Sequence, residues 1–107
     1  MEIIQVQQRI EGCMDKINPV LKEYHKAKSE YENIKEMQKT MLAVYELKHS
    51  DKSPQDSIKR HALADDDYKE FLEGLKEARE KFNRAWALLE ALRIEVDLLR
   101  SLNKHLN

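Results

Sequence analysis

The sequence predicts an all-α protein: an elongated antiparallel helical hairpin of the coiled-coil type, with a short extra helix after the loop. Three observations support this fold class. Apolar residues recur at steps of three and four along both halves of the 107-residue chain, which is the period of one helix face. Glycine and proline number two each, too few for the turns of an all-β fold. One polar break, residues 50–53, divides a single helical domain of residues 1–107 into arms of residues 1–49 and 54–107.

The first arm carries an apolar heptad over most of its length. Its members are Ile3, Val6, Ile10, Cys13, Ile17, Val20, Tyr24, Ala27, Tyr31, Ile34, Met41 and Tyr45. Pro19 interrupts this arm, because a proline inside a helix removes one backbone hydrogen bond. Either Asn18 caps a new helix with Pro19 in its first turn, or one helix continues with a kink. We prefer the first alternative, with both pieces along roughly one axis.

The second arm begins with a short helix. Ser53 is the expected N-cap and Pro54 the first helical residue, the position at which proline is best tolerated. The apolar residues that follow are out of phase with those further on, so a break is expected between Ala64 and Asp67. Asp67 and Glu70 then resemble a capping box at the start of the next helix.

A second heptad runs from residue 68 to residue 106 without interruption. Its members are Tyr68, Phe71, Leu75, Ala78, Phe82, Ala85, Leu89, Leu92, Val96, Leu99, Asn103 and Leu106. A helix of this length extends about 58 Å, which predicts an elongated molecule in which residue i lies roughly opposite residue 103 minus i. The alternative is a three-helix bundle in which residues 1–18 fold back.

The long helix also carries apolar residues away from this heptad, at Leu88, Ile94, Leu98 and Leu102. A lone hairpin leaves such residues in water, so they predict a partner or oligomer face and a homodimer formed through the C-terminal arm. We assign Asn103 to the same face, since a polar residue at a heptad core position often fixes register and oligomeric state.

A second candidate surface is the flank of the long helix that contains Arg79, Arg84, Trp86, Arg93 and Arg100. Spaced guanidinium groups beside an indole can follow a phosphate backbone and stack on a base. The same pattern occurs where arginines pair with glutamates across a coiled coil. We prefer this structural interpretation, because the chain as a whole is slightly acidic.

The sequence contains no phosphate-binding loop, serine-hydrolase elbow, zinc-protease motif or cysteine pair, so we predict no enzymatic activity, cofactor or metal site. Cys13 occupies a heptad core position and is expected to be a small buried hydrophobe. His61 and Asp65 are spaced to form a surface pair on one helix. The three aspartates at positions 65–67 are typical of a helix N-terminus.

The charge balance and the cysteine content bear on partners and location. Nineteen basic and twenty acidic residues give a net charge of -1, so no bulk positive field attracts the chain to nucleic acid or to an anionic membrane. The start of the sequence resembles neither a signal peptide nor a membrane span. A single cysteine suits a reducing compartment. We therefore expect a cytoplasmic protein.

The run from Glu70 to Lys104, above all ALRIEVDLLRSLNK at residues 91–104, resembles a group of short all-helical proteins of bacteriophages and prophages. Tyr24, Ala27 and Tyr31 fit the helix with spaced aromatic and alanine positions that precedes a polar break in that group. The resemblance implies an accessory protein without enzymatic activity, often encoded among replication and recombination genes. The expected function is an adaptor or inhibitor that binds a phage or host protein in the host cytoplasm. The alternative is a replication or recombination accessory protein that binds DNA through the arginine flank.

Overall fold

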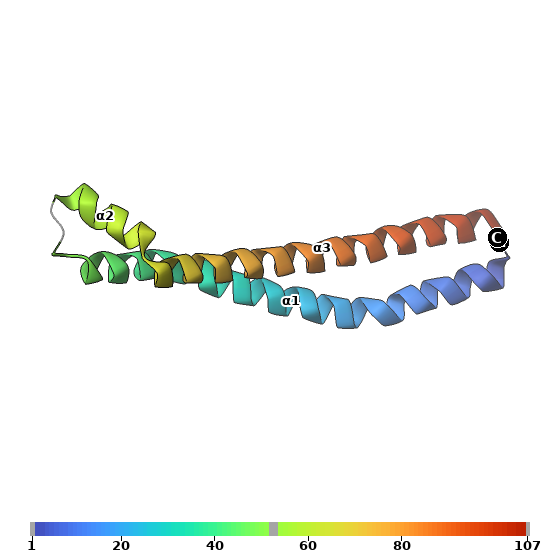
Figure 1. The fold of residues 1–107 in the computed structure, drawn as a ribbon. Coiled ribbons are helices and arrows are strands. Elements are labelled where there is room, and N and C mark those ends of the chain that lie inside the picture. Colours follow the sequence, from blue (N-terminus) through green and yellow to red (C-terminus); the bar gives the residue numbers. More distant parts are fainter. Residues whose placement is uncertain (1, 52–53, 107) are drawn as a thin grey trace. The chain divides into compact units, whose positions relative to one another are not determined.

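The computed structural model describes residues 2–51 and 54–106, which form three helices and, within those ranges, no strand. Helix α1 spans Ile3–Lys48, helix α2 spans Gln55–Ala64 and helix α3 spans Asp66–Leu106 (Figure 1). The all-α class and the short helix after the loop are therefore confirmed. The expected N-cap Ser53 and part of the expected loop lie outside the described residues.

Helix α1 continues without a break through Pro19. The preferred interpretation, a new helix capped by Asn18, is therefore wrong, and so is the alternative bundle in which residues 1–18 fold back. The cost of an internal proline is on the order of 3 kcal/mol. The heptad offsets this cost, because Ile17 and Val20 stay in phase on either side of Pro19 and both become partly buried.

The described chain divides into two compact units. The first joins Met1–Ala27 to Lys81–Asn107, and the second comprises Lys28–Glu80. Each unit contains a segment of α1 and a segment of α3, and α2 belongs to the second. Each unit therefore has its own packing.

In the first unit the start of α1 lies alongside the end of α3, drawn in blue and red in Figure 1. The core consists of Val6, Cys13, Val96 and Leu99, with Ile10 and Ile17 packed against it. Arg9 forms an ion pair with Glu95, and the ring centroids of Tyr24 and Phe82 are 5.5 Å apart. Residue numbers rise along α1 as they fall along α3, so the two segments are antiparallel, as the hairpin predicts.

In the second unit the end of α1 packs on α2 and on the first turns of α3. The rings of Tyr45 and Tyr68 lie 5.6 Å apart, and Tyr68 and Ala62 are almost fully buried. Tyr45 therefore lies against Tyr68, whereas the expected register places it opposite Ile58. The pairing of α1 with the second arm differs from the expected one because α2 is itself part of the turn and does not extend the second arm of the hairpin.

The first residues of α2 and of α3 differ from those that the sequence predicts. Pro54 has φ -80° and ψ -179° and is the N-cap of α2, so it precedes the helix and is not its first residue. The break between α2 and α3 falls within the expected stretch, at Asp65. Asp65 and not Asp67 caps α3, because the Asp65 Oδ1 atom accepts a 2.9 Å hydrogen bond from the amide of Asp67.

The buried core of the first unit predicts a strong effect of one truncation. Leu99 is 7% exposed, so Leu99→Ala should lower the free energy of unfolding by about 2–5 kcal/mol through lost burial and the cavity left behind. Urea denaturation followed by circular dichroism measures this loss. Leu47→Ala is the matched control, since Leu47 is 74% exposed and its truncation should change the free energy by less than about 0.5 kcal/mol. Equal losses in the two variants would contradict this core.

Candidate functional site

Helix α3 carries a second apolar stripe on the side away from the core of the first unit. We call it the outer stripe; its members are Ala87, Leu88, Ala91, Ile94, Leu98 and Leu102. Leu88 is 54% exposed, Ile94 57%, Leu98 66% and Leu102 37%. Large aliphatic side chains gathered on one exposed face mark an interaction surface more often than scattered ones do. The structure thus places all four predicted apolar residues together on this face.

The two stripes of α3 follow the same period in different phases. The core residues Leu92, Val96 and Leu99 are nearly inaccessible, whereas Leu98 is displaced from Val96 by two residues, about 160° around the helix axis. The inner stripe repeats at alternating steps of three and four, and the members of the outer stripe from Leu88 to Leu102 follow one another at steps of three or four residues, so each forms one continuous helix face. Helix α3 therefore has two apolar faces, of which α1 covers one.

Asn103, which the sequence assigned to the same face as the four aliphatic residues, lies apart from them. It continues the inner heptad and is partly buried, and its Oδ1 atom is inaccessible and has no hydrogen-bond partner. Five residues separate it from Leu98, which is about 140° around the helix. Asn103 thus belongs to the inner seam.

Only three of the five residues of the predicted arginine flank share one side of α3 within the first unit. Trp86, Arg93 and Arg100 follow each other at steps of seven along α3 and are exposed. Arg84 precedes Trp86 by two residues and therefore points to nearly the opposite side of the helix, toward the outer stripe. Arg79 belongs to the second unit. The flank of the first unit consists of Trp86, Arg93 and Arg100.

A shallow hollow of about 290 Å³ lies beside this flank, between the α1 and α3 segments of the first unit. Its lining residues are Met14, Ile17, Arg93, Val96, Asp97 and Arg100. Met14 is 48% exposed, so the floor offers apolar surface to a ligand. Two guanidinium groups and one carboxylate complete the lining.

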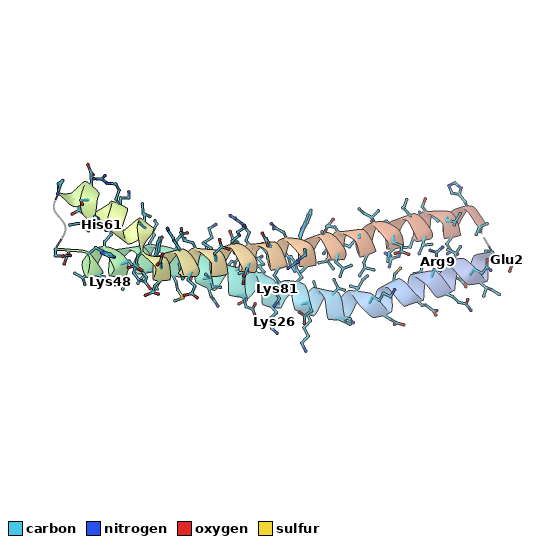
Figure 2. All side chains as sticks on the ribbon, in the orientation of Figure 1. Glu2, Arg9, Lys26, Lys48, His61 and Lys81 are labelled. Carbon is cyan, nitrogen blue, oxygen red and sulfur yellow. The ribbon has the colours of Figure 1, made fainter. Side chains whose placement is uncertain are left out.

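The charged groups around the flank are paired both within α3 and with α1. Arg93 donates a 3.0 Å hydrogen bond to Glu90 of its own helix. Glu95 instead pairs with Arg9 of α1 at 3.9 Å, and Figure 2 shows Arg9 beside the last turns of α3. Exposed pairs of this kind contribute at most about 1 kcal/mol, so the core and not the flank holds the helices together.

Cys13 is buried and free, as predicted. Burial raises the pKa of its thiol, and the neighbouring carboxylate of Glu95 raises it further. A thiol with a raised pKa stays protonated at neutral pH and is a poor nucleophile. Cys13 therefore contributes packing and not reactivity.

A polar cluster at the junction of α2 and α3 was not predicted. The Oδ2 atom of Asp65 accepts a 2.9 Å hydrogen bond from Nζ of Lys48 and lies 2.8 Å from Nε2 of His49. The Asp65 side chain is only 7% exposed. Lys48, and after it His49, holds the pKa of this carboxyl well below its usual range. The cluster ties the end of α1 to the start of α3.

The expected pair of His61 and Asp65 does not form. His61 Nδ1 lies 2.8 Å from the carbonyl oxygen of Ser57, one turn earlier in α2, and Figure 2 shows His61 and Lys48 on neighbouring elements. Because α3 begins directly after Asp65, the Asp65 carboxylate lies at the end of α1, where Lys48 and His49 both contact it. Two adjacent hydrogen-bonding side chains at the end of the first arm, Lys48 and His49, were the available signal in the sequence.

Within residues 2–51 and 54–106, no group of three or more histidine, cysteine, aspartate or glutamate side chains is arranged to hold a metal ion. Over the same residues, none of the helices has both the length and the apolarity to cross a bilayer.

Comparisons with protein-family models, with curated proteins and with solved structures found no match to this chain. The resemblance to short phage proteins therefore rests on the sequence pattern alone.

The cluster at Asp65 predicts a dependence of stability on pH. A carboxyl with a lowered pKa in the folded state stabilises the fold above its ordinary pKa of about 4, and that stability disappears as the pH falls below it. We expect the midpoint temperature of the wild type to fall between about pH 4 and pH 2. Asp65→Asn keeps a capping oxygen and removes the charge, so its midpoint should change less over this range.

Comparison of Asp65→Ala with Asp65→Asn separates the contribution of the helix cap from that of the ion pairs. Asp65→Ala removes both, so at neutral pH its midpoint temperature should lie below that of Asp65→Asn by roughly 5 °C, the order of one lost N-cap in a domain of this size. Thermal melts followed by circular dichroism measure both effects. A wild type and an Asp65→Asn variant with the same pH profile would show that these ion pairs do not stabilise the fold.

Proposed function

We propose that the protein acts without catalysis, as an adaptor or inhibitor that binds other protein chains through the first unit. The outer stripe of α3 assembles two copies of the chain, and the hollow beside Arg93 receives a segment of a phage or host protein in the host cytoplasm. The observation that carries this proposal is the exposure of Leu88, Ile94, Leu98 and Leu102 after α3 has already packed on α1. Such a face costs solubility unless another chain covers it.

The chemistry of the hollow supports binding rather than catalysis. Its titratable groups are Arg93, Arg100 and Asp97, and an arginine neither gives nor takes a proton at neutral pH. The hollow is also shallow, whereas general acid–base catalysis needs a cleft that positions a substrate and excludes water. Cys13, which precedes Met14 in α1, is buried, and burial raises the pKa of its thiol.

The same lining favours a protein segment over DNA. Asp97 lies between Arg93 and Arg100 on α3, and Glu90 already accepts a hydrogen bond from Arg93. These carboxylates repel a phosphate backbone. A peptide with one apolar side chain and a neighbouring carboxylate fits better, since Met14 and Ile17 take the apolar group and an arginine takes the acid. Methionine, tryptophan and arginine are also the residue types enriched at protein interfaces.

Affinity capture tests this function. The tagged full-length chain should retain one stoichiometric protein from a nuclease-treated lysate of its natural host at about 0.5 M salt, where exposed charge attraction is largely screened. Met14→Glu should lose that protein, because it places an acid on the apolar floor. Met37→Glu is the matched control on α1, since Met37 is similarly exposed at 52% and belongs to the second unit. Retention of the protein by Met14→Glu would contradict the hollow as its site.

A gel shift with single- and double-stranded DNA separates the alternative function. At ~150 mM salt, where screening acts beyond about 8 Å, we expect no binding at micromolar concentration. Micromolar binding that Arg93→Ala weakens would overturn the preference for a protein partner.

A further inference from the structure

The outer stripe has a length and a charge pattern that select one occupant. It extends over residues 87–102, about four turns of helix, and all of its members belong to the first unit. An α-helix with apolar residues at similar steps of three and four is the natural cover for it, because side chains of one helix then enter the spaces between those of the other. The remaining question is which helix, and in which direction.

We propose that the same stripe of a second copy covers it, with the two α3 helices antiparallel, Ile94 of each chain against Leu98 of the other and Glu90 opposite Lys104. This inference rests on the proposed self-assembly and adds its direction and register. In this arrangement Leu88 also faces Leu102 of the second copy. A two-fold axis relates the copies, so each favourable contact occurs twice.

The flanking charges distinguish this register from a parallel one. With parallel helices, Glu90 of each copy comes close to Glu95 of the other, which places two pairs of like charges beside the seam. In the antiparallel register the neighbour of Glu90 is the cation Lys104. Antiparallel helices also place the opposite ends of their dipoles side by side.

The adjacent antiparallel register, displaced by one step along the seam, is less favourable. It brings Glu90 to Asp97 of the second copy and leaves Leu88 beside Glu95. The proposed register does bring Glu95 and Asp97 near their own copies. These are two like-charge contacts, as many as in the parallel register, but only the proposed register adds two contacts of opposite charge, between Glu90 and Lys104 of the two copies.

Disulfide trapping tests direction and register together. In a Cys13→Ala background, two single-cysteine chains, Ile94→Cys and Leu98→Cys, carry tags of different size. They are mixed in equal amounts at tens of micromolar and oxidised with glutathione. Because a disulfide needs Cα atoms within about 7 Å, the antiparallel register predicts that the mixed dimer is the main product. Leu47→Cys is the control and should remain monomeric.

The possible products distinguish a failure of the proposed register from a failure of self-assembly. Dimers that each cysteine variant forms mainly with itself would show parallel helices and overturn the register while leaving self-assembly in place. No trapped dimer together with a dimeric mass before oxidation would also overturn the register alone. No trapped dimer and a monomeric mass would overturn self-assembly itself.

A charge exchange gives an independent test without cysteines. Glu90→Lys and Lys104→Glu should each raise the dissociation constant of the dimer by about 2- to 10-fold, because each creates two like-charge contacts. The double variant restores opposite charges and should return to within about 2-fold of the wild type. Additive weakening in the double variant would overturn the pairing of Glu90 with Lys104.

Discussion

The structure depends on one constraint: a helix can bury only one apolar face against one neighbour, and α3 has two such faces. The inner face is covered by α1, and its members Leu92, Val96 and Leu99 are nearly inaccessible in the single chain. The outer face keeps Leu98 and its neighbours in water. Because the hydrophobic effect scales with the apolar area removed from water, the second face provides a driving force that the isolated chain leaves unused.

The same division separates the groups that maintain the fold from those available for binding. The core of the first unit and the Asp65 cluster of the second hold α1 against α3, and they bury Cys13 and most of the Asp65 carboxylate. The outer stripe and the exposed side chains at the hollow, Met14, Arg93 and Arg100, lie outside both. Substitutions there should therefore change association without unfolding the chain, which makes the two properties separable by mutation.

Much of the fold could be predicted because helical periodicity is a local property. The two heptads contain the core residues of the first unit. The difference in phase between the apolar residues of 58–63 and the heptad that starts at Tyr68 predicted a break in the stretch that contains Asp65. Local rules failed where several residues compete for one role. Asp65 and Asp67 are equally good caps by type, and tertiary contacts with Lys48 favour Asp65.

Other features depend on contacts that no local pattern contains. A proline preceded by asparagine indicates a helix start, yet the burial of the seam on both sides of Pro19 keeps α1 continuous. The register near the loop depends on where α2 packs, so the contact of Tyr45 with Tyr68 could not be read from the arm lengths. The four outer aliphatic residues were predicted together and are all exposed, whereas Arg84 and Asn103 lie at other angles around α3 than the residues with which they were grouped.

The mass of the protein in solution, measured by light scattering at tens of micromolar, tests most directly whether α3 uses both faces. We expect twice the 12.7 kDa of one chain for the wild type and for Leu47→Glu, and the mass of one chain for Leu98→Glu. Circular dichroism should show all three to be equally helical. A wild type that remains monomeric at this concentration, or a Leu98→Glu variant that remains dimeric, would contradict the claim that the outer stripe is an assembly face.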